Sequence, residues 1–203
     1  MPKVEFFFDC SSPWTYMGFE SILKLREKLG FDIIWKPILV GGVFNEVNQG
    51  LYAARESMFN NERRMTHFMK DMQDWADYCG IKIGWPDFHP VNSVKAMRGC
   101  FVALEHDKLE PYARATFEAY WGQLADISDD SVITDICNKV GIDSSELLEK
   151  ISQPSYKDQL RECTSELIER GGYGSPTMFI DGDDMYFGND RMPLLEKRLS
   201  ALI

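Results

Sequence analysis

The feature that most constrains the fold is the stretch from Val4 to Tyr16, where an apolar run leads directly into a helix start. Phe and Val dominate residues 3–8, which favours a buried strand. Ser12 and Pro13 follow, and Ser before Pro is typical of the first turn of a helix. The backbone N–H groups at such a start lack partners within the helix and carry a partial positive charge.

Two interpretations of Ser12 follow from this position. The residue comes at the carboxyl end of a predicted parallel strand, the edge of an α/β sheet where ligands bind. Its hydroxyl can serve as a plain N-cap, which stabilises a helix by about 1 kcal/mol. It can also help the helix start to hold an oxygen or sulfur atom as an anion. This stretch alone favours the cap.

Bulk composition narrows the class of protein. The chain has 203 residues, 44% hydrophobic and 27% charged, which suits one soluble domain or one domain with a large insertion. The net charge is −10 and no basic run occurs, which argues against a nucleic-acid or anionic-membrane surface. No signal-like segment precedes the first strand and no apolar run is long enough to span a bilayer. We therefore expect a cytoplasmic protein.

Cysteine and histidine usage predicts neither disulfides nor a metal centre. The five cysteines are odd in number and widely spaced, and no C-x-x-C motif occurs, so free and mostly buried thiols are expected. The three histidines do not fall at the spacing that metal ligands require, and we predict no metal site.

The predicted elements begin as strand–helix–strand. Apolar positions on one side of residues 13–29 predict a helix that ends at Gly30. Residues 31–38 predict a second strand, which makes a βαβ unit with parallel strands. The Gly- and Asn-rich segment 40–50 is predicted to be a loop.

Beyond that loop the pattern turns helical and returns to β only near the C-terminus. Residues 177–187 predict a hairpin that turns at Asp181-Gly182. Asn189 and Asp190 are predicted to cap a final helix over residues 190–202. The helices predicted between these regions cover residues 57–80, 93–106, 110–124, 129–140, 144–153 and 154–171.

Two segments that flank the helical block together match a known pattern. One is FFDCSSPWTY at residues 7–16, and the other is GGYGSPT at residues 171–177. The arrangement resembles the DsbA family, whose thioredoxin-like α/β fold carries an all-helical insertion. The resemblance implies a thioredoxin-like domain over 1–50 and 155–203 and a helical insertion over 51–154. The family's later proline is cis, which sequence alone does not justify for Pro176.

The tetrapeptide at residues 12–15 narrows this resemblance. The DsbA motif is Cys-Pro-x-Cys, whereas this chain has Ser-Pro-Trp-Thr, so dithiol–disulfide exchange has no sulfurs to use. The serine version resembles kappa-class glutathione transferases and 2-hydroxychromene-2-carboxylate isomerases over nearly the whole chain. The further matching segments are KPILVGGVF at 36–44, FMKD at 68–71, PVNSVKAMR at 90–98, AYW at 119–121, DISD at 126–129 and GNDR at 188–191.

The resemblance implies glutathione as the cofactor. Ser12 would stabilise its thiolate, and the thiolate rather than the serine would be the nucleophile. The backbone of Ser175, beside Pro176, would pair with the cysteinyl part of the tripeptide. Asn48 matches a further contact in the loop after the second strand.

The same resemblance places the γ-glutamyl end of glutathione at Asn189 and Asp190. Capping of the last helix explains Asp190 equally well. For the substrate itself, the candidates are Trp14 as an aromatic contact and Lys36 and Arg191 as carboxylate ligands. Trp14 can equally be a core aromatic.

Three functions remain open at this stage. The favoured one is a glutathione-dependent isomerase that adds the thiolate to a bicyclic aromatic carboxylate, lets the ring open and rotate, and then expels the thiolate. The second is a kappa-class transferase or peroxidase acting on electrophiles. The third is a non-catalytic thioredoxin-fold binding module. The expected partners are glutathione and a small aromatic or electrophilic substrate, without nucleic acid or membrane, and a homodimer is an expectation from the family.

Overall fold

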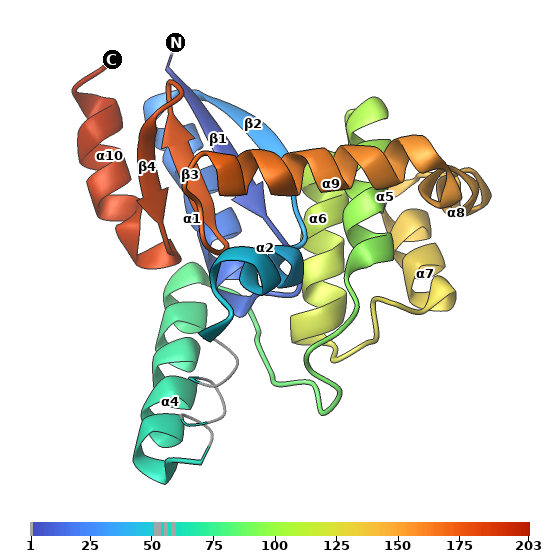
Figure 1. The fold of residues 1–203 in the computed structure, drawn as a ribbon, viewed down its shortest axis with the longest axis horizontal. Helices are drawn as coiled ribbons and strands as arrows, with labels where there is room; N and C mark the ends of the chain where they lie inside the picture. Colours follow the sequence, from blue (N-terminus) through green and yellow to red (C-terminus); the bar gives the residue numbers. More distant parts are fainter. Residues whose placement is uncertain (1, 51–53, 55–56, 58–59) are drawn as a thin grey trace.

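The computed structural model describes residues 2–50, 54, 57 and 60–203, and its centre is a mixed four-stranded sheet (Figure 1). The strands lie in the order β2-β1-β3-β4. The first strand, β1 (Lys3–Phe8), pairs in parallel with β2 (Asp32–Pro37) and antiparallel with β3 (Thr177–Ile180). The edge strand β4 (Asp184–Phe187) pairs antiparallel with β3. The predicted strands and their parallel opening unit are thus present.

The side chains of β1 alternate between two hydrophobic clusters, as expected for a strand covered on both faces. Phe6 and Phe8 belong to the large cluster that includes α1 (Pro13–Leu29). Phe7 belongs to a smaller cluster that includes Leu167 and Phe179. All three β1 phenylalanines are fully buried. In Figure 1, α9 (Pro154–Glu169) crosses in front of the sheet and α1 lies behind it.

Segment 40–50 differs from the predicted loop, because residues Val40–Val47 form the helix α2. Gly41 and Gly42 lower the intrinsic helix propensity, which is why the sequence predicts a loop. Tertiary contacts outweigh that propensity. The backbone N–H of Val40 donates to Asp9 Oδ2 at 2.9 Å, which caps the helix from outside its own sequence. Val43 is fully buried in the cluster with Phe7.

The middle of the chain is helical, as predicted, and packs onto the sheet domain. One continuous cluster joins Phe6 and Phe19 to Met97, Phe117 and Trp121. The division into residues 1–50 with 155–203 and 51–154 stays a prediction. Part of the predicted helix 57–80 lies outside the described residues. The observed elements are α4 (Glu62–Cys79), α5 (Val94–Glu105), α6 (Leu109–Phe117), a π-helical turn (Glu118–Gly122), α7 (Asp130–Val140) and α8 (Ser144–Ser152).

The C-terminal region confirms the hairpin and corrects the start of the last helix. Asp181 and Gly182 have φ of 47° and 110°, so the chain turns where the Asp-Gly pair predicts. Residues Asn189–Arg191 form a 3₁₀ turn instead of a cap, and α10 covers Met192–Ser200. The residue at the N-cap position of α10, Arg191, makes no side-chain capping hydrogen bond with the described residues. Asp190 instead pairs with the guanidinium of Arg191.

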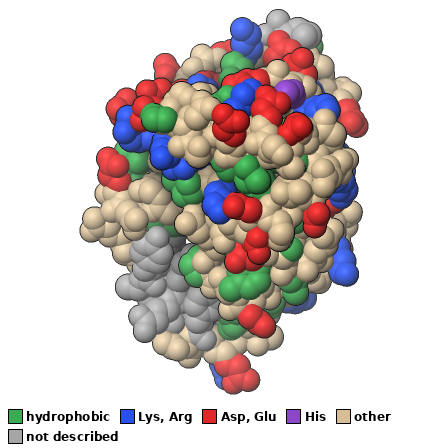
Figure 2. All heavy atoms as spheres, turned by 90° about the vertical axis from the view of Figure 1, so that its right-hand side faces the viewer, with side chains coloured by type: hydrophobic (Ala, Val, Ile, Leu, Met, Phe, Trp, Pro, Cys, Tyr) green, Lys and Arg blue, Asp and Glu red, His purple; other side chains and the backbone are tan. Residues whose placement is uncertain are grey.

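The surface carries mixed charge on the face seen in Figure 2, where acidic side chains are interspersed with Lys and Arg. Among the described residues, no helix is long and apolar enough to cross a membrane. All five cysteines are free and four are buried, as predicted. Two X-Pro bonds in the described part of the chain are cis, Ser175-Pro176 and His89-Pro90, and the second has no counterpart in the sequence predictions.

Candidate functional site

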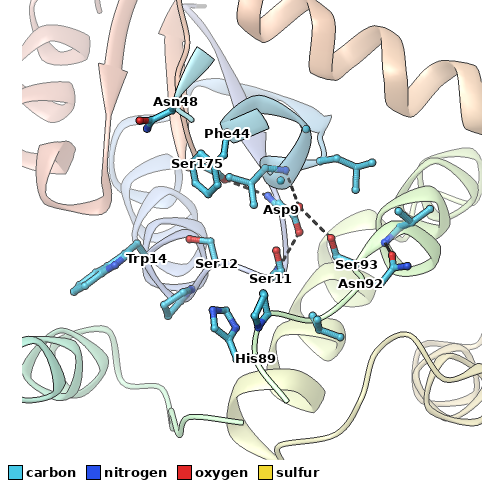
Figure 3. Close-up of a pocket in the computed structure, with 18 of the residues that line it drawn as sticks. Asp9, Ser11, Ser12, Trp14, Phe44, Asn48, His89, Asn92, Ser93 and Ser175 are labelled. Carbon is cyan, nitrogen blue, oxygen red and sulfur yellow. Dashed lines mark hydrogen bonds between the residues drawn. The ribbon is translucent and has the colours of Figure 1, made fainter. Parts of the chain in front are cut away.

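A cavity of about 600 Å³ opens where β1 ends (Figure 3). The starts of α1, α2 and α5 meet at this cavity, with Ser12, Val40 and Val94 on its wall. The positive ends of three helix dipoles therefore lie at one region. Of the residues predicted for the site, Ser12, Trp14, Asn48 and Ser175 line the cavity.

Asp9 connects the three elements that build the cavity wall. Its Oδ1 accepts a hydrogen bond from the N–H of Ser11 at 2.9 Å. Its Oδ2 accepts from the N–H of Val40 at 2.9 Å and from the hydroxyl of Ser93 at 3.1 Å. The side chain is almost completely buried, and this burial raises its pKa against the lowering effect of the hydrogen bonds. Asp9 therefore fixes the starts of α2 and α5 against the end of β1.

Ser12 is the N-cap of α1 and also faces the cavity. Its Oγ accepts a hydrogen bond from the N–H of Thr15 at 3.2 Å. Because the oxygen is the acceptor in this bond, capping does not use the hydroxyl proton. The two interpretations made from the sequence are therefore compatible, since one oxygen can cap the helix while its proton points to a ligand atom.

Ser175 is held on the cavity wall by a buried chain of hydrogen bonds. Its Oγ accepts from the N–H of Asp9 at 3.2 Å and lies 2.8 Å from Thr15 Oγ1. Among the described residues, no hydrogen bond occupies the backbone N–H or C=O of Ser175. Thr15 therefore acts here as a support for Ser175. A peptide with an extended backbone can pair with these open main-chain groups.

Aromatic side chains cover much of the remaining wall. Trp14, Phe68 and Trp85 form a chain of edge-to-face contacts, with ring centroids 5.7 Å apart at each step. Phe44, Tyr173 and Phe187 line another part of the cavity. Such walls suit a flat apolar ligand. Among the described lining residues, no Lys or Arg is present.

The other predicted site residues do not line this cavity. Lys36 forms ion pairs with Glu166 at 2.8 Å and Glu5 at 3.9 Å, which explains its position on β2 without a ligand. Pro176 is buried against α1, where its Cγ comes within 2.9 Å of the point a Cβ would occupy at Gly18.

The remaining three predicted residues, Asn189, Asp190 and Arg191, lie on the turn before α10. Asn189 is buried, and its Nδ2 lacks a partner among the described residues. Asp190 and Arg191 are exposed.

Several lining residues were missed by the sequence predictions. Asp9 belongs to the motif at residues 7–16, and nothing in that motif predicts that its side chain caps α2. Asn92 and Ser93 enter the sequence predictions only within the matching segment 90–98, and Asn92 Oδ1 accepts from the N–H of Val94 at 3.1 Å. Ser93 instead donates to Asp9. His89 belongs to no motif, so the sequence does not mark it as a site residue.

The neighbouring thiol Cys10 is not a reactive group of this site. It is fully buried, and burial raises the pKa of its thiol well above the usual value. Its backbone carbonyl accepts a hydrogen bond from Trp121 Nε1 at 2.9 Å. Among the described residues, no cluster of His, Cys, Asp and Glu is arranged to hold a metal ion.

The fold and the Ser175-Pro176 wall define the class of protein. The family model of the DSBA-like thioredoxin domain matches residues 3–200, and the chain belongs to that family. A probable DsbA oxidoreductase from Streptomyces coelicolor shares this fold, with a TM-score of 0.80 at 17% identity, covering 99% of this chain and 89% of that one.

Within the family, the chain is similar to two groups of enzymes. It is 28% identical to 2-hydroxychromene-2-carboxylate isomerase from Pseudomonas putida, over 98% of this chain and 95% of the relative. It is 30% identical to human glutathione S-transferase kappa 1, over 95% of this chain and 88% of the relative. A solved 2-hydroxychromene-2-carboxylate isomerase superposes with a TM-score of 0.82 at 28% identity, covering 98% and 95% of the two chains.

Proposed function

We propose that this chain is a glutathione-dependent isomerase of the 2-hydroxychromene-2-carboxylate type. The observation that carries the proposal is the pairing, in one cavity, of the Ser12 hydroxyl at a helix start with Ser175 beside a cis proline. The similarity to isomerases of that name supports the substrate class. When bound, glutathione supplies a thiolate that can add reversibly to a conjugated carbon.

The residues of the cavity fit a tripeptide thiol. The Ser12 hydroxyl donates to the sulfur, and the N-terminus of α1 adds a favourable potential for a negative charge. Both effects lower the pKa of the bound thiol. The open backbone of Ser175 pairs with the cysteinyl residue, and Asn48 lies within the same cavity to contact the peptide. Peptide recognition by an added strand uses main-chain groups in this way.

The γ-glutamyl end is assigned to the turn at Gly188, Asn189 and Asp190. Asp190 is an exposed carboxylate suited to an α-amine, although it must leave its pairing with Arg191. The turn follows β4 directly, and β4 neighbours the strand that begins after Ser175-Pro176. The cysteinyl and γ-glutamyl contacts would thus come from adjacent strand ends.

A kappa-class transferase is the second candidate, because the chain is similar to enzymes of that name. Both functions use the same activated sulfur, and the aromatic walls accept a flat electrophile as readily as a chromene. The isomerase substrate also carries a carboxylate, and none of the described lining residues is cationic. The N–H groups of Val40 and Val94 already donate to Asp9 and Asn92, so that carboxylate would rely on the positive potential at the starts of α2 and α5.

The test is the pKa of glutathione bound to wild type and to Ser12→Ala, measured by ultraviolet titration of the thiolate absorbance. A hydrogen bond to a charged group contributes about 1.5–3 kcal/mol, so we expect the pKa to rise by about 1–2 units in the variant. Turnover of hydroxychromene carboxylate should fall with it. The matched control is Asp143→Ala, which removes the N-cap of α8 away from the cavity.

Each function predicts a different outcome. Equal thiol pKa values in wild type and Ser12→Ala would mean that Ser12 is only a cap. Absence of heat on titration with millimolar glutathione would favour the non-catalytic binding module. Conjugation of 1-chloro-2,4-dinitrobenzene without hydroxychromene turnover would favour the transferase. The homodimer stays a prediction, to be tested by sedimentation.

A further inference from the structure

His89 is a polar group of the cavity that the glutathione site does not use. It lines the same cavity as Ser11 and Ser12, and Figure 3 shows the three side chains among those that line it. Its ring is half-buried, and the segment that carries it joins α4 to α5. Two neighbouring tryptophans contact the ring, Trp85 at 4.7 Å and Trp121 at 5.4 Å between centroids.

The position of the imidazole is fixed by a hydrogen bond. Nδ1 of His89 lies 2.7 Å from the hydroxyl oxygen of Tyr120, and Tyr120 is fully buried. Tyr120 and Trp121 both belong to the π-helical turn Glu118–Gly122. Such turns are rare within helices and are frequent at functional sites. Here the turn brings two consecutive side chains, Tyr120 and Trp121, against one histidine.

The same π-helical turn also forms a hydrogen bond with the segment that carries Ser12. Trp121 Nε1 donates to the backbone carbonyl of Cys10 at 2.9 Å, two residues before Ser12. Tyr120 and Trp121 therefore fix the position of His89 relative to the segment that carries Ser12. A hydrogen bond to one ring nitrogen sets the tautomer and orientation of an imidazole, as required of a catalytic acid or base.

We propose that His89 is the catalytic acid–base residue that transfers the proton when the chromene ring opens. The proposal rests on the proposed isomerase function. In the substrate, one carbon carries both a hydroxyl group and the ring oxygen. This role requires the tautomer in which Nδ1–H donates a hydrogen bond to the Tyr120 hydroxyl oxygen, so that Nε2 can accept the proton of the substrate hydroxyl.

The step balances without any other reactant. As the hydroxyl oxygen loses its proton, its bond to carbon becomes a carbonyl double bond. The bond between that carbon and the ring oxygen breaks, and its electron pair goes to the ring oxygen. The imidazolium then returns the same proton to the ring oxygen, which becomes a phenol. Nothing is oxidised or reduced, and His89 ends neutral.

The sharpest variant is His89→Asn. The asparagine amide can take the place of Nδ1 and keep the hydrogen bond to Tyr120, while the nitrogen that serves the substrate is lost. General acid–base catalysis contributes typically 10²–10⁴-fold, so we expect kcat for hydroxychromene carboxylate to fall by about 100-fold or more. Conjugation of glutathione to 1-chloro-2,4-dinitrobenzene needs no proton transfer to a ring oxygen, so it should fall much less than isomerisation does. His67→Asn, on the exposed side of α4, is the matched control.

Two further measurements separate catalysis from support. Imidazole in the buffer should restore part of the activity of His89→Ala, because a small base can occupy the vacated space. Turnover of substrates with electron-withdrawing ring substituents should fall less in His89→Asn. These substituents make the ring oxygen less basic, and it can then leave without first receiving a proton.

The outcomes distinguish this proposal from the one it rests on. Wild-type protein without hydroxychromene turnover overturns both. Normal turnover in His89→Asn overturns the role of His89 and leaves the isomerase intact. Equal loss of isomerisation and conjugation, without rescue by imidazole, shows that His89 only supports the fold.

Discussion

Replacing Asp9 with Asn tests whether one buried carboxylate fixes the cavity wall. The substitution keeps the shape of the side chain and exchanges one acceptor oxygen for an NH₂ group. In either orientation, that group faces a backbone N–H, of Ser11 or of Val40, each now bonded at 2.9 Å. A buried donor left without its acceptor costs about 1–3 kcal/mol. Removing the buried charge offsets part of this cost, so we expect a loss of about 1–2 kcal/mol at neutral pH.

The dependence on pH gives the prediction its sign. Burial raises the pKa of Asp9 in the folded state above its unfolded value, so folding disfavours the ionised form. The wild type therefore gains stability relative to Asp9→Asn as the pH falls from neutral to about 4. Urea unfolding followed by tryptophan fluorescence at both pH values measures this gap.

Asp129→Asn is a matched control, because the pKa of Asp129 is shifted in the opposite direction to that of Asp9. The N–H of Ser131 donates to Asp129 and lowers the pKa of that carboxyl. The gap between wild type and Asp129→Asn should therefore shrink as the pH falls. If Asp9→Asn unfolds at the wild-type urea concentration at both pH values, the carboxylate does not hold the start of α2.

Two further outcomes are expected. Gly99→Ala should destabilise the protein by about 3 kcal/mol in urea, because the added Cβ would lie 2.1 Å from the buried Tyr112 hydroxyl oxygen, whereas Gly41→Ala, with nothing within 4 Å, should not. Burial raises the pKa of the Cys163 thiol to about 11, so iodoacetamide should label native protein slowly at neutral pH and faster as the pH approaches that value. Wild-type stability of Gly99→Ala would contradict the first prediction. Rapid labelling at neutral pH, seen by mass spectrometry, would contradict the second.

Local signals in the sequence predict the elements that carry their own start and stop. Ser12 with Pro13 starts α1 and Gly30, with φ of 71°, ends it, as predicted. The hairpin turns at Asp181-Gly182 for the same reason. The helix α2 could not be predicted in this way, because its cap is Asp9, 31 residues earlier in the chain.

In the candidate site too, local motifs predict some residues, whereas others depend on contacts with distant parts of the chain. Ser12 and Ser175 come from motifs and meet in the cavity. Lys36 was a candidate because of its charge alone, and the sequence gives no sign of its pairing with Glu166 on α9. His89 depends on Tyr120, 31 positions away, so spacing does not reveal it.

The meeting of three helix starts around Asp9 has a consequence for how this cavity can change over time. The positive potential offered to a negatively charged ligand comes there from the helix starts, and side-chain substitutions other than to proline leave it in place. Replacing the surrounding aromatic rings would therefore alter the size and shape of the accepted molecule while the affinity for anions persists. Related sequences can exchange one acidic aromatic compound for another by altering the walls alone.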